Sequence, residues 1–263
     1  MSLFGEFILR RLSRDPHCTD YVSMAYEEKY RDPETYAVSL TRTFPNLSRM
    51  VRGRQALDIG CSDGMEALAL VAMGASKVIG IDIRIDPEKS AQLLASYPLR
   101  GCELAVMNAE KMTFADETFD VAMSCGSFEH FDEPYSVLKE CKRVVKADGR
   151  ICLTSGVWSH PWGAHMNFFT RVPWVQFIFS ESTIMNVRRC YRGDGAKRFR
   201  EVEGGLNKMG IRQFHDIVSE LSLHIEYLRL VPVRRLSCLA RIPGINEFFT
   251  SLVIAVLRKE AKT

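Results

Sequence analysis

The sequence predicts an α/β fold built on a doubly wound parallel sheet, and two observations support this class. Short apolar runs of strand length alternate with helix-like stretches along the middle of the chain. Turn and helix-start residues separate these runs, so that each strand returns to the sheet through a crossover. The expected strands are 55–59, 77–81, 103–107, 119–124 and 150–154, with two later strands at 224–230 and 251–257.

Punctuating residues define where these elements begin. Asp86-Pro87 and Asp132-Glu133-Pro134 each predict a helix start, because a proline in the first turn sacrifices no hydrogen bond. Asp148-Gly149 predicts a turn into the fifth strand. The first fifty residues carry helical signals, including residues 21–30, and are expected to cap the sheet edge. The predicted domains are therefore a helical cap at 1–50 and a sheet domain at 51–263, with an insertion at 155–210.

The first strand and its turn are the most informative part of the chain. Residues 55–64 (QALDIGCSDG) are an apolar run ending in a glycine turn, and residues 78–82 (VIGID) are a second run ending in an acid. This is the sequence form of a βαβ nucleoside site. The turn has Gly-x-x-x-Gly spacing, and Asp58, Asp63 and Glu66 crowd it. Carboxylates repel a pyrophosphate but favour a nucleoside that carries positive charge.

With these residues the chain resembles the class I S-adenosylmethionine-dependent methyltransferases, whose first motif reads roughly acid-x-Gly-x-Gly-x-Gly. The resemblance covers about residues 40–155, and Ser62 departs from the motif. It implies an enzyme with S-adenosyl-L-methionine as cofactor and makes 51–263 the methyltransferase domain. It also implies a Rossmann-like seven-stranded sheet of order 3-2-1-4-5-7-6, with the last strand antiparallel.

The resemblance implies roles for single residues. Asp58 is expected near the methionine amino group, and Gly60 and Gly64 let the backbone approach the amino-acid part. Asp82 is expected to hold the ribose hydroxyls. For Asp82 the alternative is a turn-forming or capping acid, because Asp86-Pro87 follows closely.

Two further segments complete the expected cofactor site. Asn108-Ala109 stands where many relatives carry Asp-Ala, and Asn108 can offer its carbonyl oxygen to the adenine amino group. Ser124 ends the fourth strand, where ligands of such sheets bind. The predicted cofactor-binding residues are Asp58, Gly60, Cys61, Ser62, Gly64, Asp82, Ile83, Asn108, Ala109 and Ser124.

Methyl transfer to a hydroxyl requires alignment, exclusion of water and removal of one proton. Histidine suits the last task near neutral pH. The predicted catalytic residues are His130, in the Glu129-His130 pair after the fourth strand, and His165 in the insertion; His160 is a further candidate. A purely structural role is the alternative for each.

The predicted acceptor is a small molecule with an oxygen nucleophile, and nitrogen or carbon acceptors are alternatives. Ser124-Cys125-Gly126-Ser127 replaces the Asn/Asp-Pro-Pro-aromatic motif of enzymes that methylate exocyclic amines of bases or glutamine. Two other function classes stay open. One is a catalytically silent cofactor-binding scaffold, and the other is an NAD(P)-dependent oxidoreductase.

Composition restricts partners and location. A net charge of +3 is too mild to indicate nucleic acid. The 8 cysteines are scattered without a C-x-x-C pair, which favours a reducing cytoplasm and argues against disulfides and a metal site. No apolar run is long enough to cross a bilayer. The expected location is cytoplasmic, and the sequence leaves the oligomeric state open.

The N-terminal stretch has two interpretations. Leu3, Phe4, Phe7, Ile8 and Leu12 share one helical face, and Arg10, Arg11 and Arg14 lie beside it. Docking of this stripe on the chain's own core is the favoured interpretation. A weak peripheral membrane contact is the alternative.

The insertion is expected to bind the substrate. It contains all three tryptophans, and this aromatic set either lines a pocket or forms a small local core. Its basic run from Arg188 to Arg200 marks either a solvated face or a site for an acidic substrate.

Overall fold

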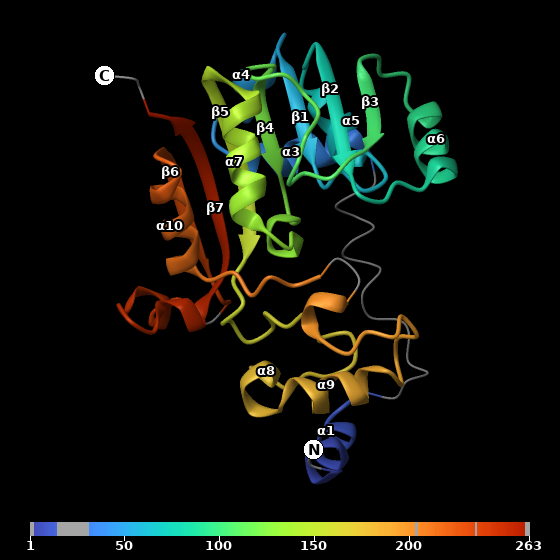
Figure 1. Ribbon diagram of the computed structural model, residues 1–263, viewed down its shortest axis with the longest axis vertical. Coiled ribbons are helices and arrows are strands. Elements are labelled where there is room, and N and C mark those ends of the chain that lie inside the picture. The colour runs from blue at the N-terminus through green and yellow to red at the C-terminus, as the bar shows by residue number, and fades with distance from the viewer. Residues whose placement is uncertain (1–2, 15–31, 203–204, 235, 261–263) are drawn as a thin grey trace.

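The computed structural model describes residues 3–14, 32–202, 205–234 and 236–260 (Figure 1). One sheet of seven strands has the order β3-β2-β1-β4-β5-β7-β6. The strands are β1 (Gln55–Ile59), β2 (Lys77–Asp82), β3 (Cys102–Val106), β4 (Phe119–Ser124), β5 (Val145–Gly156), β6 (Leu223–Pro232) and β7 (Thr250–Lys259). β1 to β5 pair in parallel, and β7 runs antiparallel to both β5 and β6. The predicted strand order and the reversed last strand are confirmed.

β5 begins earlier than expected. Phe119 of β4 pairs with Val145, whereas Val121 pairs with Arg150, so β5 holds extra residues between these two pairs. Asp148-Gly149 lies in this irregular stretch inside the strand. The prediction of a turn before the strand was wrong, because a bulge uses the same residue types as a turn.

Helices cover both faces of the sheet. α3 (Pro33–Thr43), α4 (Leu47–Val51) and α5 (Met65–Ala72) share one buried apolar cluster with the strands, and α7 (Pro134–Val144) and α10 (Ile211–Glu220) share the other. α6 (Pro87–Ser96) lies beside β3 at the sheet edge (Figure 1).

The predicted helix starts are confirmed at both prolines. The Asp86 carboxylate accepts the backbone N–H groups of Glu88 and Lys89 at 3.1 Å each, as an N-cap residue does. A 3₁₀ turn, η1 (Phe128–His130), follows β4.

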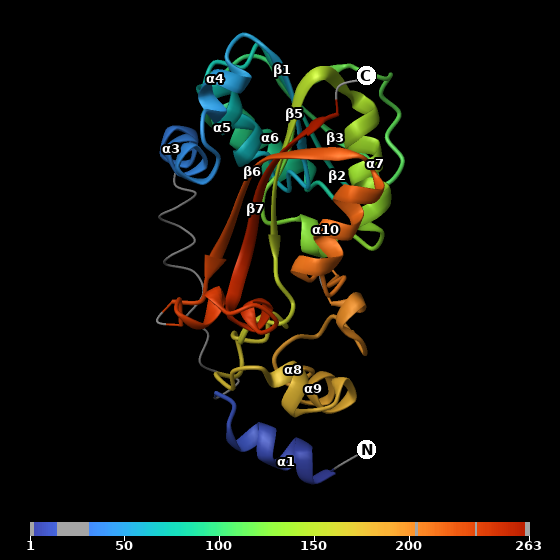
Figure 2. The same ribbon diagram turned by 90° about the vertical axis from the view of Figure 1, so that its left-hand side faces the viewer.

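The first fifty residues do not form one layer over the sheet edge. α3 and α4 lie on the sheet, whereas α1 (Leu3–Arg11) lies at the opposite end of the molecule, against α9 (Glu181–Arg188) of the insertion (Figure 2). The predicted helical stretch 21–30 is outside the described residues.

The insertion has its own apolar core. Besides α9 it contains α8 (Val175–Ile178) and η2 (Phe199–Glu201). Phe169 and Phe199 are buried in a cluster with Leu9 of α1, and Trp158 packs against it. Trp162 is instead 42% exposed. The aromatic residues therefore serve mainly as a local core, which is one of the two interpretations of the pattern.

Two short 3₁₀ turns, η3 (Leu239–Arg241) and η4 (Asn246–Phe249), connect β6 to β7. Within the described ranges, no helix combines the length and the apolar character that crossing a bilayer requires.

Candidate cofactor and active site

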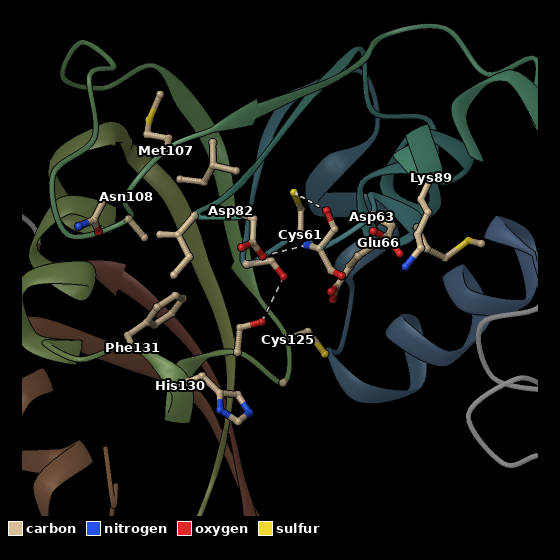
Figure 3. Close-up of a pocket in the computed structure, with 18 of the residues that line it drawn as sticks. Cys61, Asp63, Glu66, Asp82, Lys89, Met107, Asn108, Cys125, His130 and Phe131 are labelled. Carbon is tan, nitrogen blue, oxygen red and sulfur yellow. Dashed lines mark hydrogen bonds between the residues drawn. The ribbon is translucent and has the colours of Figure 1, made fainter. Parts of the chain in front are cut away.

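A pocket of about 1120 Å³ opens at the carboxyl ends of β1, β2 and β4 (Figure 3). Such an edge is where open α/β sheets bind ligands. Seven of the predicted cofactor residues line it: Gly60, Cys61, Ser62, Asp82, Ile83, Asn108 and Ala109. Asp58, Gly64 and Ser124 do not.

The turn after β1 lies against the end of β2. The backbone N–H groups of Gly60 and Cys61 donate to the Ile81 carbonyl at 2.8 and 3.1 Å. Gly60 has φ +80°, and a Cβ there would meet the Ser127 side chain at 2.5 Å. Ser62, which departs from the motif, keeps a left-handed backbone with φ +48°. The loop shape typical of glycine is therefore retained at Ser62.

Asp82 joins the two strand ends. One carboxylate oxygen accepts the Ser62 N–H at 3.0 Å, and the other accepts the Arg84 N–H at 3.0 Å. Each oxygen keeps a lone pair for a further donor. Because Asp86 is the N-cap residue of α6, Asp82 is not the capping acid of that helix.

Asp58 lies beneath the loop, fully buried. Burial raises its pKa well above the ordinary value, Glu66 and Asp82 raise it further, and the Ala67 backbone N–H partly offsets them. Asp58 therefore lies behind the pocket lining, and its raised pKa favours the protonated carboxyl when no cation is near. Gly64, with φ +102°, is the N-cap residue of α5, and Ser124 is buried.

Asn108 lies on the opposite side of the pocket from the acid-rich loop (Figure 3). Its side-chain oxygen accepts the Glu110 N–H at 2.8 Å, which leaves one lone pair and the amide group available.

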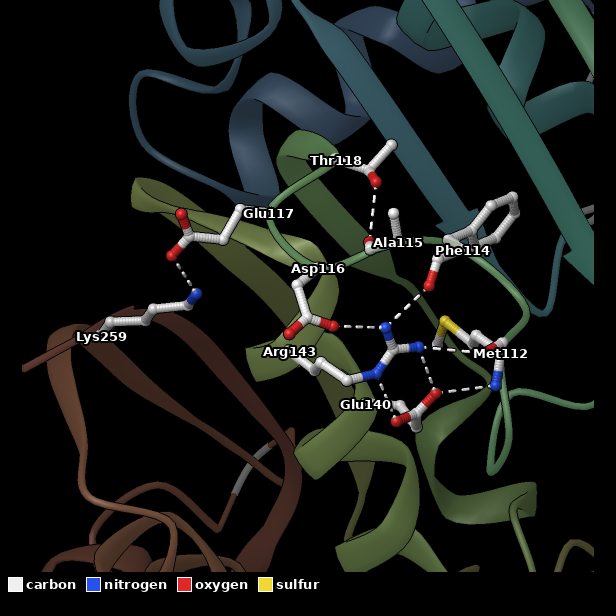
Figure 4. Close-up of polar contacts among 9 residues, drawn as sticks. All are labelled: Met112, Phe114, Ala115, Asp116, Glu117, Thr118, Glu140, Arg143 and Lys259. Carbon is white, nitrogen blue, oxygen red and sulfur yellow. Dashed lines mark hydrogen bonds and ion pairs between the residues drawn. The ribbon is translucent and has the colours of Figure 1, made fainter.

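The segment that carries Asn108 is held by Arg143 of α7 (Figure 4). The guanidinium donates to the carbonyls of Met112 and Phe114 at 2.9 and 2.7 Å, and to Glu140. Glu140 in turn accepts the Met112 N–H at 2.7 Å. This network fixes the connection between β3 and β4 and so the side of the pocket formed by Asn108.

Sequence reasoning missed one wall of the pocket. Lys89, Gln92, Leu93 and Ser96 of α6 line it, as does Tyr36 of α3. The α6 residues have the i, i+3, i+4, i+7 spacing of one helical face. That spacing is the one signal that could have identified them, but it does not say what the face covers.

The two predicted catalytic histidines lie together, although they are 35 positions apart in the chain. Their ring centroids are 5.2 Å apart. His130 lines the pocket, and its Nδ1 lies 2.8 Å from the Gly205 carbonyl oxygen. A carbonyl only accepts, so Nδ1 carries the hydrogen, and in the neutral ring Nε2 keeps a lone pair.

The two histidines of the insertion, His160 and His165, are partly buried. Burial, and then the neighbouring His130, lower the pKa of His165, while Glu129 acts in the opposite direction. Burial lowers the pKa of His160 to about 4. His160 Nδ1 accepts the Trp162 N–H at 3.2 Å, so its ring has a structural partner.

The cysteines and the basic run contribute little to the candidate site. Burial, followed by the nearby Asp58, raises the pKa of Cys61, which disfavours a thiolate at the pocket mouth. Arg188 is buried and bound by both carboxylate oxygens of Asp194. Arg198 and Arg200 line a separate hollow that also contains Glu181, Glu201 and Glu220. The basic run therefore lies among acids and does not form a uniformly positive site.

Comparison with known proteins agrees with this geometry. A family model described as a methyltransferase domain matches residues 57–153. The ubiquinone biosynthesis O-methyltransferase of Aliivibrio fischeri is 33% identical over 100 residues, which are 38% of this chain and 42% of that protein. The chloroplastic 2-methyl-6-phytyl-1,4-hydroquinone methyltransferase of Arabidopsis thaliana is 28% identical over 130 residues, 49% of this chain and 37% of that protein.

The match spans less than half the length of each of these relatives. In fold, the chain is similar to an S-adenosylmethionine-dependent methyltransferase from Mesorhizobium loti, with a TM-score of 0.57, 16% identity, and coverage of 86% of this chain and 98% of that one. Residues 57–153 therefore match the methyltransferase domain family, and the sheet around them has the fold of S-adenosylmethionine-dependent methyltransferases.

Proposed function

We propose that this chain transfers a methyl group from S-adenosylmethionine to a hydroxyl oxygen of a small, phenol-like acceptor. One observation carries the proposal: an acid-rich cofactor pocket ends at a histidine whose free nitrogen can accept a proton. When bound, the cofactor supplies an activated sulfonium methyl group. The chain then has to bind, orient and deprotonate the acceptor.

The residues present fit this cofactor. Asp82 has lone pairs left for two ribose hydroxyls, because each oxygen uses one on a backbone N–H. Asn108, Ala109 and Ile83 would hold the adenine. The Gly60–Ser62 backbone would hold the amino-acid end.

The charge of the pocket favours a cation. Glu66 and Asp82 lie close enough to Asp58 to raise the pKa of its carboxyl, so negative charge collects at the loop although Asp58 itself favours the protonated form. A sulfonium or ammonium group relieves this repulsion, whereas a pyrophosphate increases it. This argument disfavours the NAD(P)-dependent alternative.

His130 is proposed as the general base. The Gly205 carbonyl holds Nδ1–H and so leaves Nε2 to take the acceptor proton. His165 is proposed to orient His130: its ring lies against that of His130, and its lowered pKa keeps it neutral, so it adds no competing positive charge.

The relatives support the acceptor class. One is named an O-methyltransferase of ubiquinone biosynthesis, which supports both the phenol-like class and oxygen as the methylated atom. Another is named for a hydroquinone, which supports the phenol-like class alone. A phenolic hydroxyl is acidic enough for a histidine to deprotonate it during transfer. The insertion, 155–210, is proposed to choose among such acceptors because it brings His165 to the site.

Two measurements test this proposal. Calorimetry should show that S-adenosylmethionine and its demethylated product bind, while NADH does not. Incubation with methyl-labelled cofactor and a panel of phenols, amines and carboxylates should label the phenols. Cofactor binding without any labelled product would indicate a silent scaffold instead, and preferential NADH binding would indicate the oxidoreductase.

A further inference from the structure

α1 lies across one end of the molecule. Figure 2 shows its axis running transverse to the long dimension of the chain, with α8 and α9 between it and the sheet. Figure 1 shows the same helix nearly end-on at the same extremity. One side of α1 therefore meets the insertion, and the opposite side is directed away from the molecule.

The side that packs on the insertion is fixed by three contacts. Leu9 is fully buried in the apolar cluster of the insertion. Glu6 accepts a hydrogen bond from Asn186 of α9 at 2.7 Å, and Arg10 reaches the Cys190 sulfur at 2.9 Å. These contacts set the rotation of the helix about its axis.

The outward side is apolar. Phe4, Phe7 and Arg11 have i, i+3, i+7 spacing and so share the face opposite Leu9. Phe4 is 71% and Phe7 57% exposed, and the neighbouring Leu3 is 81% exposed. The prediction that this stripe docks on the chain's own core was wrong: the helix does pack on the chain, but through Leu9.

Exposed large apolar side chains concentrate at this end. In the described part of the chain, all of them except Val38, Ile83 and Val106 belong to α1 with Leu12, the insertion, or the segment 242–248. On α8, Phe177 and Ile178 are 52% and 59% exposed, and the Phe177 ring lies 5.7 Å from the ring of Phe248. The exposed apolar face of α1 is of the kind that marks an interaction site.

The same end carries exposed positive charge. Arg10 and Arg11 of α1 are exposed, as are Arg189 and Arg192 after α9, next to Cys190. Of the acids here, Asp194 is paired with Arg188, and Glu6 accepts a hydrogen bond from Asn186. The Arg11 guanidinium carbon lies 5.4 Å from the centroid of the Phe7 ring, so positive charge and apolar surface alternate on this face.

We propose that the outward face of α1, Leu3, Phe4, Phe7 and Arg11, binds the surface of an anionic lipid bilayer. The phenylalanines enter the boundary between headgroups and acyl chains, and the arginines contact the lipid phosphates. A second copy of this chain fits less well, because a two-fold contact through this face would bring like charges together. The proposal does not depend on the methyl transfer proposed above.

Vesicle sedimentation with the whole chain tests this surface. The protein should pellet with phosphatidylcholine vesicles that contain phosphatidylglycerol, pellet poorly with phosphatidylcholine alone, and be released by salt. Phe4→Gln with Phe7→Gln should weaken binding by about tenfold or more, since both inserted rings are lost. Val38→Gln is the matched control, because Val38 is 51% exposed on α3, away from this end, and it should bind like the parent protein.

Three results would overturn the proposal. The parent protein does not pellet with anionic vesicles, or the double variant pellets equally well, or light scattering without lipid shows a dimer that the double variant dissociates. The last result would assign the face to self-association. Circular dichroism and retained binding of S-adenosylmethionine verify that the double variant is folded, so a loss of vesicle binding has one meaning.

Discussion

The sheet and the tip, defined as α1 with residues 157–210, each hold side chains in an unfavourable environment, but of opposite kinds. Under the cofactor loop the sheet buries the carboxyls of Asp58 and Glu66, whereas the tip exposes Phe4 and Phe7. Burying acids is unfavourable unless positive charge is near, and exposing phenylalanine is unfavourable unless it meets an apolar phase. The two costs indicate two ligands, a cation for the sheet and a lipid surface for the tip. The two regions should therefore act separately.

The largest effect is expected where the two regions meet. His130→Gln should lower turnover by about 10²–10⁴-fold, because glutamine cannot accept the acceptor proton, while cofactor affinity stays within about twofold. The acid limb of the pH–rate profile should disappear, which a merely structural role would not produce. Single-turnover methyl transfer, followed across a range of pH, measures both the rate and its pH dependence.

His215→Gln is the control, because His215 is exposed on α10 and should leave the profile unchanged. If the His130 variant keeps the parent rate and pH dependence, the pair is structural and the sheet acts without a base.

The next largest effect is expected on the stability of the tip, which should change independently of the sheet. Leu9→Ala should cost about 2–5 kcal/mol of local stability, because it empties a site that is fully buried between α1 and the insertion. Hydrogen exchange should accelerate in α1 and α9, and S-adenosylmethionine should bind as before. Leu57→Ala in β1, equally buried, should instead weaken the sheet and cofactor binding. Equal effects of both variants on cofactor affinity would mean that the regions unfold together.

The same contrast explains what could be predicted from sequence. Strand ends are positioned by hydrogen-bond register, so the placement of Gly60 and Asp82 at one pocket followed from the spacing of two apolar runs. The pairing of His130 with His165 did not follow from spacing, because it depends on how the insertion folds back. The face of α1 was misassigned because an apolar stripe looks the same whether a core or a lipid covers it. The burial of Leu9 and the exposure of Phe4 and Phe7 show which side of α1 packs on the chain.

Two glycines with similar backbone angles differ in how closely they approach other residues. Gly60 and Gly53 have similar φ angles, +80° and +69°, but a Cβ at Gly60 meets Ser127 at 2.5 Å and one at Gly53 meets nothing within 4 Å. Gly53→Ala should therefore cost about 1 kcal/mol, from backbone strain alone. Gly60→Ala should cost about 2–4 kcal/mol, because overpacking adds to the strain.

Denaturant unfolding and calorimetry measure the two variants. Gly60→Ala should also weaken S-adenosylmethionine binding by about tenfold or more, since a shift of Ser127 or the loop alters the pocket. Indistinguishable cofactor affinities for the two variants would show that the close approach of Gly60 to Ser127 is unimportant for binding.

The smallest expected effect is the most specific, because Asp58→Asn should move stability and binding in opposite directions. The raised pKa of Asp58 means that the unliganded fold favours the protonated carboxyl, so its stability falls as pH rises from the ordinary range of an acid through the raised pKa. Asparagine removes this penalty without changing shape. The unliganded variant should therefore gain about 1 kcal/mol at neutral pH, a rise in Tm of about 2–4 °C.

Cofactor binding should respond in the reverse sense. A cation near the loop favours the ionised carboxylate, so the parent protein should release a proton on binding and bind S-adenosylmethionine more tightly as pH rises. The Asp58→Asn variant should bind more weakly and lose this pH dependence. Calorimetry in buffers of different ionisation enthalpy counts the released proton. A variant that is both less stable and equally able to bind would mean that Asp58 stabilises the loop structurally, and the electrostatic contrast between sheet and tip would then lose its basis on the sheet side.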